Sequence, residues 1–258
     1  EAQEGVSERD KAACSYDKMM ISDMSFSLSH LTIDKVNGTG RVHIMKNRYG
    51  IDIWSDDNFF IEDGVVKVNY KPYPSLIKIV KDVRKQGFKG PLLLRFPHIT
   101  KKQVKTLFNT FNASIKEYDY KGKFNAVFPL KVNQLPNFIH PLVSYGKKYN
   151  YGLEAGSKAE LIIAMTYNNM GSPITINGFK DKEMIHLCFI AKSMGHDITV
   201  IIEGLNELEM ILEVLKETKM EAPNVGLRVR LHSGGSGVWA KSGGIDSKFG
   251  LTSTEILE

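Results

Sequence analysis

Cysteine is scarce in this sequence, since Cys14 and Cys188 are its only two among 258 residues. They lie far apart and share no metal-ligand spacing with a histidine or with each other, which argues against a zinc site and against a disulfide framework. We therefore expect unpaired thiols in a reducing compartment, with the cytoplasm as the expected location.

Long apolar runs and blocks of like charge are also missing. No segment approaches the about 20 apolar residues that cross a bilayer, and no charged and then apolar leader opens the chain. The 34 basic and 29 acidic residues are spread along the sequence and leave a formal net charge of +5. Neither a membrane nor a nucleic-acid partner is expected. The 42% of hydrophobic residues suffices for a soluble protein with one or two domains.

The first part of the chain predicts short β-structure followed by helices. Asn37-Gly38 is a turn signal between two β-like pieces and indicates a hairpin. A helix is predicted to begin at Thr100, where Gln103 would complete a capping box. The other predicted elements are hairpin strands at 31–33 and 41–45, strands at 51–54, 64–70 and 91–96, and a helix from about 75 to 86.

From Phe124 onward the chain repeats a strand followed by a helix. Ser157 and Glu160 form a second capping box at the start of one of these helices. Strict alternation of short apolar strands with helices predicts a parallel sheet with helices outside. The predicted strands are 124–129, 151–154, 174–177, 198–203 and 226–231, and the predicted helices are 134–145, 158–168, 182–194 and 207–219.

A closed barrel of the TIM type needs eight such strands, and the pattern supplies five. The fold class is therefore α/β, either part of a (βα)8 barrel or an open sheet. The chain lacks an initiator methionine, and residues 252–258 read as the first turns of an unfinished helix. We expect a fragment of a longer protein, with a naked sheet edge that invites association.

Lys131 stands at the end of an apolar strand and just before a helix, where an α/β barrel presents its reactive side chains. In an apolar pocket a lysine loses hydration of its ammonium form, so its pKa falls and the neutral amine can attack an aldehyde cofactor. Most lysines after strands are solvated ends of loops, and position alone does not separate the two interpretations.

Glu154, Arg228 and Arg230 are further candidates at the carboxyl ends of strands. Glu154 could pair with the cofactor lysine or with an arginine, or it could be an acid favoured by a helix N-terminus. Arg228 and Arg230 alternate with apolar residues, so both point to one face of a strand. That face could meet an anionic cofactor oxygen or be simply solvated.

A glycine-rich segment and two histidines are weaker candidates for a functional site. The glycine-rich segment 233–244 matches no known phosphate-binding pattern, and a mobile surface loop is the favoured interpretation. His186 and His196 lie on or beside a helix with no partner at ligand spacing, so no chemistry is assigned to them.

Five segments in order resemble the amino-terminal part of biosynthetic arginine decarboxylases, bacterial enzymes built on the alanine-racemase-like pyridoxal-phosphate barrel. The resemblance covers about Tyr49 to the end and divides the chain into an extension (1–48), β/α elements that pack on the barrel (49–122) and a truncated first part of the barrel (123–258). The segments are Arg95-Phe96-Pro97-His98, the run 127–134 around Lys131, the run 152–161 around Glu154, Asn177-Gly178-Phe179-Lys180-Asp181, and the run 226–231 leading into 247–251.

The resemblance implies that Lys131 carries pyridoxal 5'-phosphate as an imine and that Glu154 and Arg228 approach the lysine and the phenolic side of the cofactor. It further implies decarboxylation of L-arginine to agmatine and carbon dioxide in polyamine biosynthesis, a homo-oligomer, and in some cases Mg2+, for which no ligand cluster is found. The family's ring-stacking histidine, phosphate-binding glycines and pyridine-pairing acid come later in the chain, so this stretch alone is expected to be inactive.

Two alternatives remain open. A truncated homologue could bind partners and regulate polyamine synthesis without catalysis. The chain could also belong to another member of the same cofactor barrel, such as a diaminopimelate decarboxylase or a racemase.

Overall fold

The computed structural model describes residues 20–22, 50–231 and 249–257. They divide into two compact units, Glu1–Thr100 and Lys101–Glu258. Helix α5 (Pro97–Glu117) spans this division. The domain boundaries predicted at 48 and 122 stay a prediction, and the hairpin at 31–45, Cys14 and the segment 233–244 lie outside the described residues.

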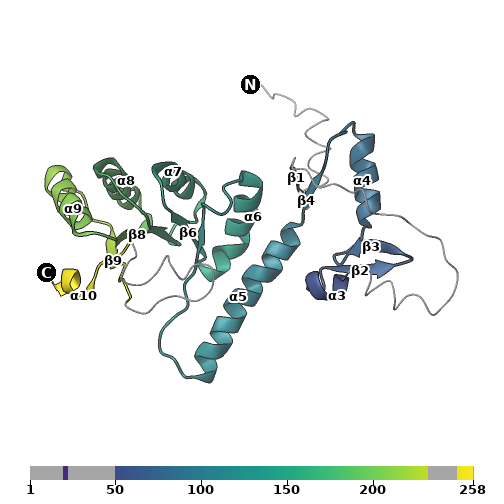
Figure 1. Cartoon of the computed structure of the whole chain (residues 1–258), viewed down its shortest axis with the longest axis horizontal. Helices are drawn as coiled ribbons and strands as arrows, with labels where there is room; N and C mark the ends of the chain where they lie inside the picture. Colours follow the sequence, from purple (N-terminus) through teal and green to yellow (C-terminus); the bar gives the residue numbers. More distant parts are fainter. Residues whose placement is uncertain (1–19, 23–49, 232–248, 258) are drawn as a thin grey trace, which may run out of the picture. The chain divides into compact units, whose positions relative to one another are not determined.

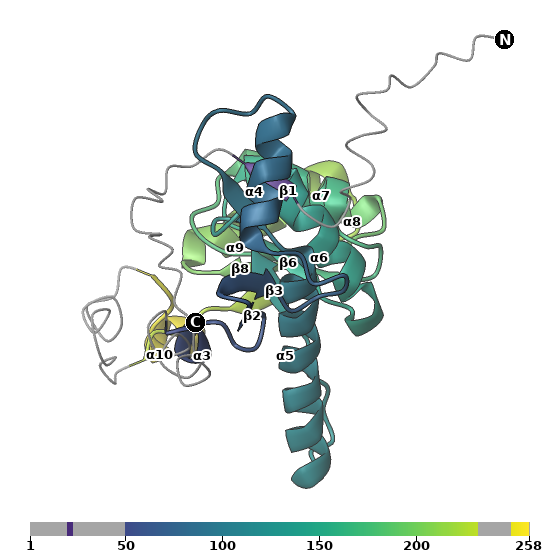
Figure 2. The same ribbon diagram turned by 90° about the vertical axis from the view of Figure 1, so that its right-hand side faces the viewer.

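The first unit contains two small antiparallel sheets and helix α4 (Leu76–Lys85). Strand β1 (Met20–Ser22) pairs with β4 (Leu93–Arg95) (Figure 1), and β2 (Phe59–Glu62) forms a hairpin with β3 (Val65–Val68) (Figure 2). The hairpin turns at Asp63-Gly64, whose φ angles of 52° and 72° suit the tight turn that this dipeptide favours. Ser75 caps α4 by accepting a hydrogen bond from the Lys78 N–H, so the predicted helix is confirmed.

Two predictions in this unit are wrong. The segment Ile51–Trp54, predicted as a strand, is the short helix α3, which follows Gly50 in the left-handed conformation. Its backbone bonds close locally, from the Ser55 N–H to the Ile51 carbonyl, and outweigh the alternating apolar pattern. The predicted helix start at Thr100 is also wrong, because α5 already begins at Pro97, whose fixed φ suits a first helical position.

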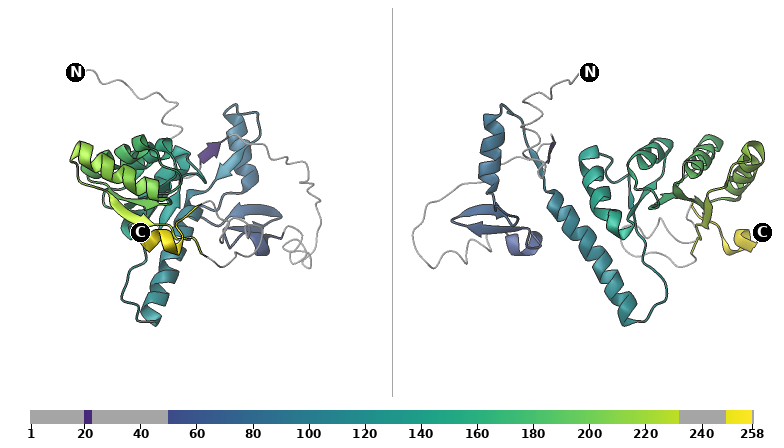
Figure 3. Two further views of the ribbon diagram at one scale, coloured as in Figure 1. Left: turned by 60° about the vertical axis from the view of Figure 1, so that its left-hand side comes forward. Right: turned by 180° about the vertical axis from the view of Figure 1, so that it is seen from behind.

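The second unit is a five-stranded parallel sheet in the order β5-β6-β7-β8-β9, which confirms the predicted sheet. Its helices α6, α7, α8 and α9 lie in a row on one side (Figures 1 and 3). Helix α10 (Ser253–Leu257) follows later in the chain. The strands are β5 (Val127–Pro129), β6 (Gly152–Ala155), β7 (Pro173–Ile176), β8 (Asp197–Ile202) and β9 (Asn224–Leu227). The helices are α6 (Pro136–Gly146), α7 (Lys158–Tyr167), α8 (Lys182–Ser193) and α9 (Leu205–Thr218), with the 3-10 turn Lys147–Tyr149 after α6.

The core of this unit lies between the sheet and its helices. Alternate strand residues are almost fully buried there, as in β8, where the buried positions face the helices. Burial of this apolar surface is the main favourable term for the unit. The cluster includes Leu153, Ile174, Ile176, Ile198, Val200 and Ile202 from the strands and Leu161, Ile185, Cys188, Phe189, Ile211 and Val214 from the helices.

The last strand departs from the prediction. It ends at Leu227 rather than at Leu231, and Arg230 instead bonds through its backbone N–H to the Leu251 carbonyl, at 2.7 Å. The alternating apolar residues were expected to cover one face. Leu227 and Val229 are both 51% exposed, so this row lies open in the structure.

No helix among the described residues is long and apolar enough to cross a membrane.

Cys188 provides a test of the core. Burial raises the pKa of its thiol to about 12, well above its usual range, so the reactive thiolate is scarce near neutral pH. In a Cys14→Ser variant, iodoacetamide at pH 8 should leave Cys188 unmodified in the native protein and label it rapidly in denaturant. Mass spectrometry reads both states, and rapid labelling of the native protein would show that this core is open.

Candidate active site

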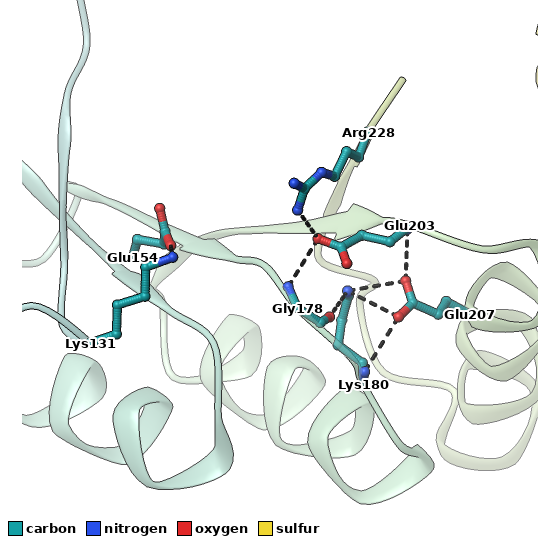
Figure 4. A network of polar contacts seen from close by, with 7 residues as sticks. All are labelled: Lys131, Glu154, Gly178, Lys180, Glu203, Glu207 and Arg228. Atoms are coloured by element: carbon teal, nitrogen blue, oxygen red, sulfur yellow. Dashed lines mark hydrogen bonds and ion pairs between the residues drawn. The ribbon is translucent and has the colours of Figure 1, made fainter. Parts of the chain in front are cut away.

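The parallel sheet gathers polar side chains at one edge. Because the strands share one direction, their carboxyl ends all lie on that edge, the usual ligand edge of such sheets. Lys131 follows β5, Glu154 lies on β6, Glu203 follows β8 and Arg228 follows β9 (Figure 4). Lys131 and Arg228 are 97 positions apart in the sequence, and the tertiary structure brings both to the same edge of the sheet.

Lys131 and Glu154 form the first pair at this edge. The Lys131 Nζ lies 3.9 Å from the Glu154 Oε1, and their side chains are 72% and 20% exposed. The Leu130 N–H donates to the Glu154 carbonyl at 3.0 Å, which aligns the two chain segments. Among the residues that the structure describes, no apolar pocket encloses Lys131, since its side chain is largely open to solvent. It is therefore reachable by an incoming carbonyl compound.

Glu160 links the two loops that carry this pair. It is 8% exposed, and its Oε1 accepts from the Gln134 side-chain amide at 2.9 Å while its Oε2 accepts from the Gly156 N–H at 2.7 Å. The predicted capping box is confirmed in one half, because the Ser157 hydroxyl accepts from the Glu160 N–H at 3.3 Å. The other half is wrong, since the carboxylate reaches Gly156 and Gln134 instead of the Ser157 N–H.

Arg228 and Glu203 form a second pair farther along the edge. The Arg228 Nη1 lies 2.9 Å from the Glu203 Oε1, and the side chains are 45% and 5% exposed. The guanidinium also lies over the Phe249 ring, 5.2 Å from its centroid. The sequence predicted an anionic partner for an inward arginine, and in this structure a protein carboxylate supplies it.

Below this pair lies a buried lysine that sequence reasoning passed over. Lys180 is fully buried, with its Nζ at 3.1 Å and 3.0 Å from the two carboxylate oxygens of Glu207. Glu207 also accepts from the Glu203 N–H at 2.8 Å. A charged side chain after a strand in Gly178-Phe179-Lys180-Asp181 was the available signal, but its partner Glu207 lies 27 positions away, in the first turn of α9.

The remaining candidates lie elsewhere. Arg230 is near Glu255, whose pKa is lowered by hydrogen bonds from Thr252 and, to a smaller extent, by the Arg230 charge. His196 is buried just before β8, at the opposite edge, and burial lowers its pKa. Among residues 20–22, 50–231 and 249–257, no three histidine, cysteine, aspartate or glutamate side chains could hold a metal ion, so nothing supports magnesium.

Comparison with known proteins identifies the class. The family model described as "Pyridoxal-dependent decarboxylase, pyridoxal binding domain" matches residues 102–258. The chain therefore belongs to the pyridoxal-dependent decarboxylase family, and the predicted family assignment and partial-barrel fold are confirmed.

Within this family, the proteins similar to this chain include biosynthetic arginine decarboxylases, as the resemblance predicted. The enzyme of Bacteroides thetaiotaomicron is 38% identical over 84% of this chain and 35% of its own length, and that of Citrifermentans bemidjiense is 41% identical over 81% and 34%. The chain thus spans about a third of the length of these curated relatives.

Two solved structures of decarboxylases are also similar to this chain. The crystal structure of the biosynthetic arginine decarboxylase of Campylobacter jejuni matches with a TM-score of 0.74 and 57% identity, over 81% of this chain and 34% of that one. A diaminopimelate decarboxylase of M. jannaschii matches with a TM-score of 0.56 and 22% identity, over 78% and 43%, which shows the shared fold.

Glu160 should be a structural requirement of this edge. Glu160→Ala removes the carboxylate that accepts two partly buried hydrogen bonds, from the Gln134 side-chain amide and the Gly156 N–H, and is expected to lower the free energy of unfolding by about 2–3 kcal/mol. The Gly156 amide should also exchange with deuterium faster. Urea denaturation and hydrogen exchange measure both effects.

The matched control is Glu183→Ala, since Glu183 is 81% exposed and pairs with Lys158 at the surface. Its loss is expected to cost no more than about 1 kcal/mol. Equal costs for the two variants would contradict the assigned role of Glu160.

Proposed function

We propose that this chain forms the cofactor-binding part of an arginine decarboxylase, which converts L-arginine to agmatine and carbon dioxide for polyamine synthesis. The observation that carries the proposal is the accessible Lys131 amine beside Glu154 at the carboxyl edge, within a chain 57% identical to the arginine decarboxylase of Campylobacter jejuni.

The side chains at this edge fit pyridoxal phosphate. An exposed amine suits its aldehyde, and a guanidinium at the same edge suits an anionic oxygen. Lys131 and Arg228 would hold the cofactor, with Glu154 beside the amine. When bound, the cofactor supplies an aldehyde for covalent attachment of amines and a ring that accepts the electron pair left by the departing carboxylate.

The chain's own residues would orient the bound ligand and carry protons. Lys131 would hold the cofactor through its Nζ, and the same Nζ, when free, would be able to carry a proton. Glu154 would orient that amine through their ion pair, an attraction that strengthens where a bound ring excludes water. Arg228 donates hydrogen bonds to an anionic oxygen of the ligand.

The substrate, the homo-oligomer and the cytoplasmic location belong to the proposal as well. A guanidinium substrate needs acidic groups to recognise it, and we infer that these lie outside the described edge or on a second copy of the chain. A diaminopimelate decarboxylase or a racemase would act on other amino acids, and a regulatory homologue would act on none, so substrate assays on a full-length protein that contains this chain separate the three.

Cofactor attachment should be specific to Lys131. We expect incubation with pyridoxal phosphate, reduction with borohydride and peptide mapping to place the adduct on Lys131. Lys131→Ala should abolish it, whereas Lys121→Ala should leave it unchanged, since Lys121 is an 82% exposed lysine paired with Asp119. Adducts scattered equally over surface lysines would refute the proposal.

Turnover is expected to be absent in the chain by itself. The resemblance places the acid that pairs with the pyridine nitrogen outside this stretch, and without that acid the ring is a poor electron acceptor. Release of labelled carbon dioxide from carboxyl-labelled arginine should not exceed the rate with free cofactor. Faster release would contradict this expectation and would show that the chain carries a complete catalytic set.

A further inference from the structure

Glu203 is a buried carboxylate with no assigned part in the proposed chemistry. Its side chain is 5% exposed, and its Oε1 accepts hydrogen bonds from the Gly178 N–H at 3.1 Å and from the Arg228 Nη1 at 2.9 Å (Figure 4). Burying a carboxylate is costly unless hydrogen bonds and an opposite charge compensate it. Both forms of compensation are present here.

The position of Glu203 is fixed from two sides. On one side the Gly178 N–H, from the loop after β7, holds the carboxylate. On the other side Glu207 accepts from the Glu203 N–H at 2.8 Å. Glu207 is itself 3% exposed and held by the fully buried Lys180. Glu203 is therefore a fixed anion.

The charges along this network alternate in sign. Lys180 pairs with Glu207, and Arg228 pairs with Glu203, so two cations balance two anions at the end of the sheet. Lys180 and Glu207 are enclosed, whereas Arg228 is 45% exposed. The network thus leads from a buried, fixed pair to a guanidinium that reaches the carboxyl edge.

We propose that Glu203 is a positioning residue, which holds the Arg228 guanidinium at the carboxyl edge ready to bind an anionic oxygen of the cofactor, and that the Lys180–Glu207 pair holds Glu203 in turn. This inference rests on the proposed function, since pyridoxal phosphate is the ligand that Arg228 meets. A guanidinium held in advance loses less conformational entropy on binding, so the cofactor binds more tightly.

The same contacts could serve only to join the ends of β8 and β9, and a double-mutant cycle separates the two roles. Glu203→Gln keeps the size of the side chain and an acceptor for the Gly178 N–H but removes the charge. It is combined with Arg228→Gln, and the dissociation constant of pyridoxal phosphate is measured by absorbance titration for all four proteins. Glu213→Gln is the control, because Glu213 forms an exposed ion pair with Lys182 at 3.3 Å.

We expect Glu203→Gln to weaken cofactor binding about tenfold, as for a lost charge-assisted contact, and to have no effect in the Arg228→Gln background. Glu213→Gln should leave binding unchanged. Equal weakening in both backgrounds, or none in either, would overturn the positioning role while leaving the proposed function in place.

A second measurement needs no cofactor. In the unloaded wild-type chain, the Arg228 side-chain NMR signals should show restricted rotation of the guanidinium, and Glu203→Gln should remove that restriction. Free rotation in the wild type would overturn the positioning role. Failure of the wild type to bind pyridoxal phosphate at Lys131 would refute the proposed function, and with it the cofactor-directed role of Glu203.

Discussion

Parallel pairing of the five strands is the constraint on which the rest of the second unit depends. It commits alternate side chains of each strand to the helices on one side, and it brings the carboxyl ends of all strands to one edge. The same register that buries Ile174 and Ile198 therefore also decides that Lys131, Glu154 and Arg228 share a surface. A slip of one residue in any strand would exchange its buried and open faces and scatter the edge.

Buried polar side chains hold the loops at that edge. Glu160 ties the loop after β5 to the loop after β6, and Glu207 ties the loop after β7 to the loop after β8 through Lys180 and the Glu203 N–H. Breaking a buried ion pair such as Lys180–Glu207 costs about 3–5 kcal/mol, whereas an exposed pair such as Lys158–Asp181 contributes little. The difference lies in solvation, because water cannot replace a lost partner in the interior.

The end of the sheet is less well covered than its centre. Ile202 of β8 is 1% exposed, but its neighbour Leu227 on β9 is 51% exposed, in the same register. An open apolar row at the end of a sheet favours association with a further strand or another molecule. This agrees with a chain that spans about a third of the length of its relatives.

The sequence by itself determined the alternation of strands and helices, the position of Lys131 after an apolar strand, and the family, because these depend on local patterns and on consecutive motif residues. It misjudged Ile51–Trp54, where local helical bonds outweighed the alternating pattern, and the capping role of Glu160. Only the tertiary structure decided that Glu160 bonds to Gln134, that Lys180 is buried against Glu207, and that Glu203 holds Arg228. Each of these contacts joins residues 25 to 27 positions apart, which is about the length of one strand–helix repeat. Local sequence preferences do not reach across that separation, so they could not predict these contacts.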